Sequence, residues 1–361
     1  MQKLLWIGSP FFARDMEKCG WDLRFHNFEH TAVFHWQDLV EIAGGPPDVL
    51  VVADKSRPPF VLGMEDFPCL TVFYCVDSHI HSYYPYYAQG FDICLVSLRD
   101  HIPSFQNLVL ADDRVVHAPA FAKDGDLPPG PEAFKAENVD AALISFAERD
   151  WDLLFVGNVD SENTPHRKQF MQALAGVLPN FEITRGDYRE LFPRARIVLN
   201  HCELGDLNFR VFEALGCGST LLTPLVGHGL AEMFELEKDL FTYQMNNWGD
   251  ALNKVRELLA NPRACVAAAK SGFAKVNLHH RAIHRAEALT YYLLSLGREV
   301  KSSPYQQYDK DGLDYQHIIG LRHARAREVR RDYLKLIYLL LADKIDDPLL
   351  KESYLEAAKD R

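Results

Sequence analysis

Hydrophobic residues in the first third of the chain gather in short runs that are separated by longer mixed segments. The runs are Leu4–Ile7, Asp48–Val52, Leu70–Tyr74 and Ile93–Val96. Runs of this length bounded by turn residues are typical of buried strands. The segments between them are long enough for crossover helices or loops, so the pattern predicts a parallel sheet.

A second alternating block begins at Trp151. Its predicted strands are Trp151–Val156, Ile197–Asn200, Thr220–Thr223 and Leu240–Tyr243, and its predicted helices are Arg167–Val177, Tyr188–Arg194 and Phe209–Leu215. After Asp250 the pattern is almost entirely helical, over 250–260, 262–276, 280–296 and several segments beyond 313.

The stretch Ala122–Pro131 is rich in glycine, proline and aspartate and is the best linker candidate. A helical segment, Glu132–Glu148, then leads into the second block. A chain of 361 residues suggests two domains. We therefore expect an α/β protein with two Rossmann-like domains facing across a cleft and an added C-terminal helical region. The expected parts are 1–122, a linker and connecting helix over 123–150, 151–278, and C-terminal helices over 279–361.

Composition narrows the class of protein. The formal net charge of −11 argues against a nucleic-acid-binding protein, whose partner needs a basic surface. Hydrophobic residues make up 48% of the chain and aromatic residues 12%, enough for folded cores. Seven cysteines are scattered without a Cys-x-x-Cys pair, which favours buried, reduced thiols.

The ends of the chain show no targeting or membrane signal. The N-terminal run is too short for a signal peptide, and the late apolar run from Leu336 to Ala342 is far shorter than a membrane span. We therefore expect a cytoplasmic protein with no transmembrane segment.

The most informative segment is Gly205–Gly218, which reads as a polar loop, a helix start and an apolar helical face. Arg210 lies in the first helical turn, where a cation is unfavourable unless an anion is near. Free N–H groups and a guanidinium there can bind phosphate. Glu213, three residues on, could accept hydrogen bonds from ribose hydroxyls. The alternative is an Arg210–Glu213 surface pair on an ordinary helix.

This segment resembles the donor-site signature of the CgeB-like (spore-protein) glycosyltransferases of the GT-B type. Two further segments are similar to that family in order and spacing: Asp152–Asn158 followed by Arg167, and His280–Arg285. The resemblance covers roughly 151–290. Retaining relatives often carry a pair of glutamates here, whereas this chain has Asp206 as the first acidic residue.

The resemblance implies a donor site for a nucleotide-diphosphate sugar in the second domain. The residues it assigns to the donor are Gly157, Asn158, Arg167, Asp206, Asn208, Arg210, Glu213, Gly216, Gly218 and His228. Other roles stay open for several of them. Gly216 and Gly218 would also allow close helix–strand packing, Asn208 or Asp206 is a good N-cap, and Gly227-His228-Gly229 also fits a surface turn. A solvated surface position is the alternative for Arg167 and for its neighbour Lys168.

The acceptor side is predicted at the end of the strand Leu70–Tyr74, because open parallel sheets bind ligands at the carboxyl ends of their strands. Asp77 and His79 are the candidate catalytic residues there, since either could take the acceptor proton. The tyrosines that follow, Tyr83, Tyr84, Tyr86 and Tyr87, form either a stacking wall or part of the core.

We expect no metal site, because His280 and His284 lack a third ligand in sequence. The expected function is a metal-independent bacterial glycosyltransferase that moves a sugar from a nucleotide-sugar donor to a protein or surface-glycan acceptor, with no cofactor. Two alternatives are a GT-B-fold nucleotide-sugar epimerase or phosphorylase, and a silent module whose arginine-rich helix, Asp314–Ala342, docks a partner.

Overall fold

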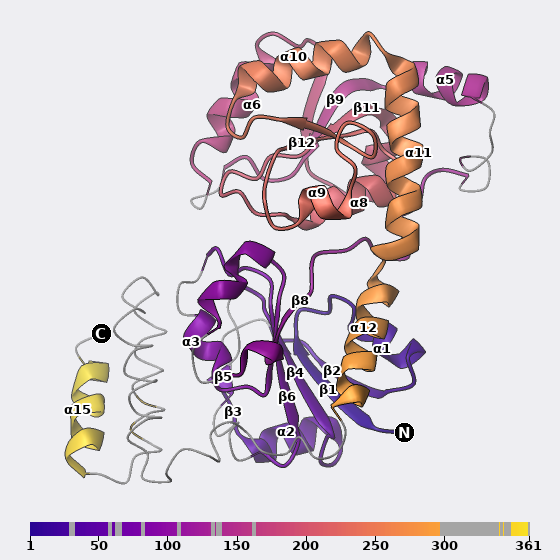
Figure 1. The fold of residues 1–361 in the computed structure, drawn as a ribbon. Helices are drawn as coiled ribbons and strands as arrows, with labels where there is room; N and C mark the ends of the chain where they lie inside the picture. The colour runs from indigo at the N-terminus through magenta and orange to yellow at the C-terminus, as the bar shows by residue number, and fades with distance from the viewer. Residues whose placement is uncertain are drawn as a thin grey trace.

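The structure is a computed structural model. It describes residues 1–28, 33–56, 60–61, 67–80, 84–106, 110–130, 134, 139–160, 164–296, 339, 342 and 348–359. The arginine-rich segment 314–338 and the helices expected beyond 313, apart from α15 (Pro348–Lys359), lie outside the described residues. Two parallel sheets with helices on both faces form the body of the chain (Figure 1).

The first sheet has the strand order β2-β1-β4-β6-β7-β8, and every pair is parallel. Its strands are β1 (Lys3–Gly8), β2 (Asp22–His26), β4 (Val49–Ala53), β6 (Leu70–Cys75), β7 (Ile93–Val96) and β8 (Val115–His117). The four predicted strands are confirmed; β2 and β8 were not predicted. A separate two-stranded pair joins β3 (Val33–Phe34) and β5 (Phe60–Val61).

Both faces of this sheet are buried, which explains the continuous apolar runs of its strands. Leu5 and Ile7 of β1 belong to a core with α2 (Trp36–Ala43) and α3 (Tyr84–Ala88). Leu4 and Trp6 face the opposite way, into a core with α1 (Ala13–Lys18) and α12 (Ala282–Ser295). The 3-10 helices η2 (Arg99–Ser104) and η3 (Asp112–Arg114) flank β7 and β8.

The second sheet has the order β10-β9-β11-β12-β13 and is also entirely parallel. Its strands are β9 (Trp151–Val156), β10 (Phe181–Thr184), β11 (Ala195–Leu199), β12 (Leu221–Pro224) and β13 (Phe241–Tyr243). Its helices are α5 (Val139–Ala147), α6 (Arg167–Ala175), α7 (Tyr188–Leu191) with η4 (Phe192–Arg194), α8 (Phe209–Gly216), α9 (Leu230–Met233), α10 (Trp248–Leu259) and α11 (Pro262–His279). The prediction missed β10 and α9.

Alternation along β9 again separates two cores. Leu153 and Phe155 pack with residues of α6 and α10, whereas Leu154 and Val156 pack with residues of α8. The predicted helix over 132–148 is confirmed only for Val139–Ala147 and for Phe134, because most of 131–138 lies outside the described residues.

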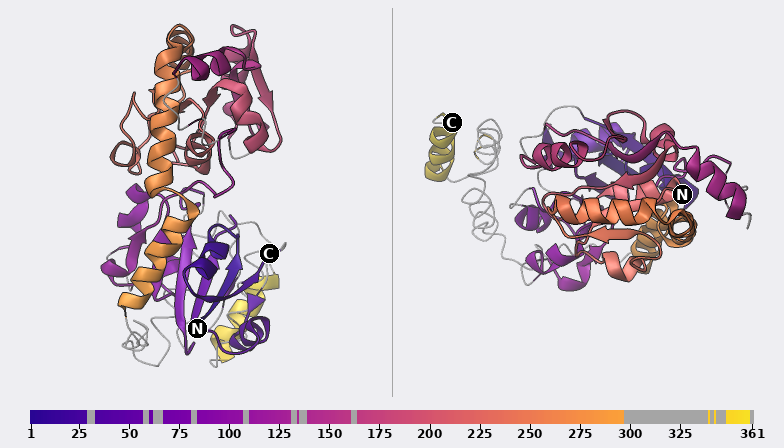
Figure 2. Two further views of the ribbon diagram at one scale, coloured as in Figure 1. Left: turned by 90° about the vertical axis from the view of Figure 1, so that its right-hand side faces the viewer. Right: turned by 90° about the horizontal axis from the view of Figure 1, so that it is seen from above.

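The chain passes between the two sheets twice. It leaves the first sheet through the linker that begins near Ala118, and it returns where α11 ends and α12 begins. Helix α11 lies along the second sheet and α12 along the first (Figures 1 and 2). A parallel bridge joins Ala122 to Arg281, so the two passages lie side by side.

Arg281 fastens this junction. Its guanidinium donates to the carbonyls of Lys123, Asp126 and Gly216 at 2.8, 2.6 and 3.3 Å, and it also bonds Asn277. Arg285, one turn on, donates to the carbonyls of Pro119 and Ala120. The linker is therefore held against both the last turn of α8 and the start of α12.

Candidate functional site

The carboxyl ends of the strands in the two sheets face each other. Phe11, just after β1, stacks on Phe209 at the start of α8, with ring centroids 5.6 Å apart. Asp100, beyond β7, contacts His228, beyond β12. In open parallel sheets this edge is where ligands bind, and here the two edges meet.

Arg210 lies at the edge of the second sheet. Its guanidinium donates to the carbonyl of Val156 at 2.8 Å and to Oδ1 of Asn200 at 3.0 Å, and its Cζ lies 4.7 Å from the centroid of the Phe155 ring. Gly157 makes this possible, because a Cβ there would lie 2.8 Å from Nη2 of Arg210. The arginine is thus held by the ends of β9 and β11.

Arg167 is the second cation at this edge. Its side chain donates to the carbonyl of Asn158 at 3.1 Å and to that of His201 at 3.5 Å, and its buried Nε has no hydrogen-bond partner. It is close enough to Arg210 that the two charges repel; burial and this repulsion lower the pKa of Arg210. Within the described part of the chain, neither guanidinium is in an ion pair with a carboxylate.

The starts of α6 and α8 differ. Glu203 caps α6 by accepting from the N–H groups of His166 and Arg167 at 3.0 and 2.9 Å. Asn208 is the residue before α8, but its side chain does not cap the helix as we expected. Its amide instead donates to Asn200 at 3.2 Å, and its Oδ1 is buried without a partner. The positive end of α8 is therefore not covered by a side-chain acceptor.

His201 adds a neutral ring beside these cations. It stacks on Phe170 at 4.3 Å, and burial together with Arg167 and Arg210 lowers its pKa to about 4. Its Nε2 is also buried without a partner. Asp206 is half-buried, and its charge reaches Arg210 and His228. Sequence reasoning passed over His201, although a polar residue directly after a predicted strand was the available signal.

Glu213 lies on the linker side of α8 and not in a surface pair with Arg210. The Tyr188 hydroxyl donates to Asp126 at 2.8 Å and also hydrogen-bonds Glu213. Burial, and then the charge of Asp126, raise the pKa of Glu213 to about 7. The Arg210–Glu213 pair that we kept as an alternative is absent from the ion pairs of the described residues.

Gly216 and Gly218 are packed against the linker. A Cβ on Gly216 would lie 2.8 Å from the Cβ of Ala122, and one on Gly218 would lie 2.8 Å from the Cβ of Pro128. Gly218 also has a φ of +67°, which favours glycine. These contacts show the packing role that was left open above for both glycines. They give no indication that either residue faces a ligand.

Asn158 and Lys168 are on the surface. Asn158 closes a short turn with Asp160 and accepts from Arg185, and Lys168 forms an exposed ion pair with Asp160 at 2.9 Å. The surface alternative therefore describes Lys168, whereas Arg167 is drawn into the strand edge.

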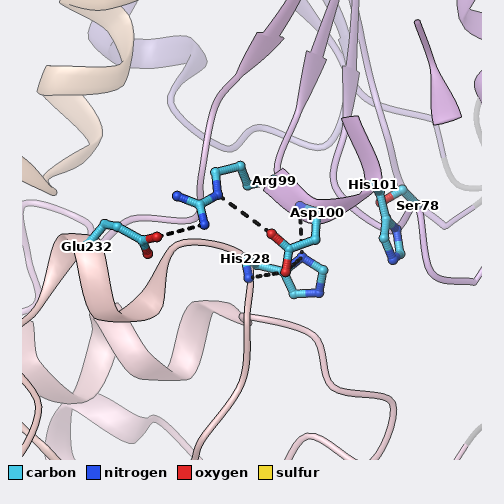
Figure 3. A network of polar contacts seen from close by, with 6 residues as sticks. All are labelled: Ser78, Arg99, Asp100, His101, His228 and Glu232. Carbon is cyan, nitrogen blue, oxygen red and sulfur yellow. Dashed lines mark hydrogen bonds and ion pairs between the residues drawn. The ribbon is translucent and has the colours of Figure 1, made fainter. Parts of the chain in front are cut away.

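His228 lies where the two domains touch (Figure 3). Its N–H donates to Oδ2 of Asp100 at 2.7 Å, and its Nδ1 accepts from the N–H of Asp100 at 3.2 Å. Beside it, Arg99 pairs with Glu232 at 2.9 Å. A Cβ on Gly227 would lie 2.1 Å from Oδ2 of Asp100, so the glycine permits this approach.

His101 continues this contact on the acceptor side. Its Nδ1 is 2.9 Å from Oγ of Ser78, and its ring meets that of His228 edge to face at 5.1 Å. Burial, and then His79, lower the pKa of His101. Arg99, Asp100 and His101 were not predicted, although they follow the predicted strand Ile93–Val96 as a polar run.

The predicted acceptor residues lie at the edge of the first sheet. Asp77 accepts a hydrogen bond from the hydroxyl of Ser56. His79 is half-buried, and its Nδ1 is buried without a partner. The stacking wall is not formed by Tyr84 and Tyr87, which are buried in the core; Tyr83 and the side chain of Tyr86 lie outside the described residues.

His280 and His284 have separate structural roles. Nδ1 of His284 accepts from the N–H of Arg281 at 3.0 Å, whereas His280 is buried against Phe212 and Phe234. Over the described residues, no three His, Cys, Asp or Glu side chains come together as a metal-binding group. Over the same residues, no helix has both the length and the apolar character needed to cross a bilayer.

The second sheet and its helices resemble a known protein family. Residues 141–290 match a family described as glycosyl transferase-like. That region holds both unpaired guanidinium groups, Glu213 and His228. A comparison with curated proteins found no match.

Solved structures extend the likeness to most of the chain. Anabaena Alr3699/HepE in complex with UDP-glucose is 11% identical, with a TM-score of 0.58 over 82% of this chain and 100% of that one. An alpha,alpha-trehalose-phosphate synthase (UDP-forming) from Burkholderia vietnamiensis is 10% identical, with a TM-score of 0.54 over 86% and 99%. Sucrose-phosphate synthase from Thermosynechococcus elongatus is 12% identical, with a TM-score of 0.51 over 83% and 99%. The predicted GT-B fold is confirmed.

Proposed function

We propose that this protein is a nucleotide-sugar-dependent glycosyltransferase, related to the CgeB-like enzymes, that transfers a sugar to a protein or glycan acceptor. The observation that carries the proposal is the pair of half-buried guanidinium groups, Arg167 and Arg210, beside the uncapped start of α8. Two neighbouring cations without a carboxylate partner repel each other, so an anion between them is the expected occupant. The glycosyl transferase-like match over the same residues supports the diphosphate of a sugar donor as that anion.

In the reaction, the bond between the anomeric carbon and the diphosphate oxygen breaks, and a bond from the acceptor oxygen to that carbon forms. Negative charge develops on the departing diphosphate, and Arg210, Arg167 and the dipole of α8 stabilise it. This arrangement needs no divalent metal. The acceptor proton passes to a base at the edge of the first sheet, for which Asp77 and His79 are the candidates.

The other donor contacts follow from the positions of the residues. Glu213 lies one helical turn beyond Arg210, beside Tyr188 of α7, where a ribose would follow the diphosphate. Gly157 and Asn158 border the same edge, as do Asp206 and Asn208. His228 approaches from the loop after β12 and would lie beside the donor sugar. UDP is the first nucleotide to test, because structural neighbours were solved with UDP or UDP-glucose.

The test is a thermal-shift and calorimetry screen of UDP, GDP, TDP, ADP and CMP with the purified protein. We expect one nucleoside diphosphate to raise the melting temperature. Arg210→Ala should weaken its binding by about 2 kcal/mol or more, because charge-assisted hydrogen bonds are lost. The matched control is Arg194→Ala. Arg194 covers the Trp151 ring at the other end of β9, 4.5 Å from its centroid, and should leave binding unchanged.

Binding of no nucleotide by a folded protein would contradict the proposal. Nucleotide release that never depends on an acceptor would instead favour an epimerase or phosphorylase on the same fold.

A further inference from the structure

Asp54 is a buried carboxylate that the proposed reaction leaves without a role. It follows β4 directly, and its side chain is 1% exposed. Oδ2 accepts from the N–H groups of Val76 and Asp77 at 3.1 and 2.7 Å. Oδ1 accepts from the N–H of Ser56 at 2.6 Å and from the hydroxyl of Tyr84 at 2.7 Å. One carboxylate therefore joins three segments at the carboxyl edge of the first sheet: the turn after β4, the loop after β6 and the start of α3.

The bonds converge on the segment that contains the candidate base. Asp54 fixes the backbone of Asp77, while Ser56, itself bonded to Asp54, donates its hydroxyl to the Asp77 carboxylate. Ser78, the next residue, bonds His101 in the interdomain contact. The segment 76–79 is thus held at its start by Asp54 and in its middle by His101.

A comparison within the same sheet shows how this differs from a purely structural carboxylate. Asp92, also buried, accepts from the N–H and the hydroxyl of Thr71, and so ties β6 to β7 at their amino ends. Asp54 lies at the opposite edge with a second carboxylate as its neighbour. Burial, and then the charge of Asp77, raise the pKa of Asp54 to about 7, whereas the pKa of Asp92 is raised by burial without a neighbouring carboxylate among the described residues.

We propose that Asp54 is a positioning residue that holds segment 76–79, and with it Asp77 and His79, in place to accept the proton of the incoming acceptor. The proposal rests on the proposed function. A carboxylate suits this task because one group can accept two backbone N–H bonds on one oxygen and two further bonds on the other. Asparagine in the same place would turn its NH₂ group toward some of these donors.

The first measurement is amide hydrogen exchange on Asp54→Asn, with Asp92→Asn as the matched control. We expect exchange at 76–79 to accelerate by about tenfold or more in Asp54→Asn, since the two backbone hydrogen bonds to Oδ2 are weakened or lost. In Asp92→Asn the acceleration should fall near Thr71 and spare 76–79. Unchanged exchange at 76–79 in a folded Asp54→Asn protein would overturn the proposal. Hydrogen exchange needs no turnover, so it tests the role of Asp54 even if UDP-glucose is not the donor.

The second measurement is UDP release from UDP-glucose with water as the acceptor. Asp54→Asn should lower kcat by about tenfold to a hundredfold and leave KM within about twofold, because a misplaced base affects the chemical step. Asp92→Asn should keep the wild-type kcat. Wild-type kcat in Asp54→Asn would overturn the proposal, and so would an equal loss in both variants.

Double-mutant cycles separate action through the segment from a general loss of stability. Asp54→Asn is combined with Asp77→Asn and, separately, with His79→Ala. Non-additivity of about threefold or more in at least one cycle is expected, because the residues act as a unit. Additivity in both cycles would overturn the proposal. Failure of the wild-type protein to bind any of the screened nucleotides in calorimetry would count against the proposed function alone.

Discussion

The two strand-end edges that meet between the domains are built alike and charged oppositely. On the second sheet, backbone carbonyls and Asn200 hold two guanidinium groups without a carboxylate. On the first sheet, backbone N–H groups hold Asp54. Asp77 and His79 follow the neighbouring strand β6, and His101 follows β7. Under the proposed function, the same kind of open sheet offers an anion site in one domain and proton acceptors in the other. The chemistry belongs to the residues that follow the strands and not to the fold.

The largest loss of turnover is expected when the candidate proton acceptor is removed. His79→Ala should lower turnover by about a hundredfold, the lower range for general base catalysis, and leave UDP affinity unchanged because the cationic edge is intact. Steady-state kinetics with UDP-glucose, together with UDP calorimetry, measure the two effects separately. Wild-type turnover would assign the proton to Asp77 or His101 instead.

A smaller effect on nucleotide binding is expected at Glu213, one helical turn beyond Arg210. Glu213→Gln should weaken UDP binding by about 1–2 kcal/mol, because a neutral amide replaces a hydrogen-bonding carboxylate beside the ribose position. Calorimetry at pH 8, where the wild-type carboxyl is ionised, checks this. Unchanged affinity would remove Glu213 from the site and leave it a structural role with Tyr188 and Asp126.

The same variant should change how stability depends on pH. Because the pKa of Glu213 is raised to about 7 in the folded protein, its stabilising contribution is full below its ordinary pKa of 4.5 and is lost as pH rises through 7. Glu213→Gln should therefore flatten the decline in the free energy of unfolding between pH 5 and 8. An identical slope in urea titrations of both proteins would contradict the raised pKa.

The smallest effect on kinetics is expected at the contact between the two domains, where Asp100 meets His228. Gly227→Ala must push Asp100 away, since the new Cβ would lie 2.1 Å from its carboxylate oxygen. We expect a larger radius of gyration in small-angle scattering and a rise of about threefold in the KM for UDP-glucose, because part-buried hydrogen bonds contribute about 1 kcal/mol each. Gly249→Ala is the control, since its Cβ would meet only Asn247 Oδ1 at 3.5 Å. An unchanged scattering curve for Gly227→Ala would show that the contact does not hold the domains together.

The local pattern of hydrophobic residues was sufficient to predict the buried strands of this fold. Every predicted strand was found, because central parallel strands are apolar on both faces. The strands missed in the two main sheets, β2, β8 and β10, are edge strands with partly exposed residues, such as Arg24, Val116 and Phe181, so they carry little of that signal. The tyrosines after β6 were ambiguous because aromatic residues serve both cores and binding surfaces.

The candidate site was predictable where one helix carries it and not where tertiary contacts create it. Residue spacing alone predicted that Arg210 lies in the first turn of α8, and the structure confirms it. Its partners, Asn200 and the carbonyl of Val156, come from two other strand ends that only the sheet brings together. For the same reason the sequence did not indicate Asp54, because its bonds to Val76 and Asp77 span more than twenty residues of chain. Nor did it indicate the Asp100–His228 contact, because the two residues lie in different domains.

The bridge between Ala122 and Arg281 has a consequence for how such a protein can be recombined. The second sheet and its helices enter and leave the rest of the chain at neighbouring points, as an inserted module does. Helix α12 lies after the exit and belongs to the core of the first sheet. A chimaera that exchanges residues 123–281 would keep that core whole, so one acceptor half could be paired with donor halves of different nucleotide-sugar preference.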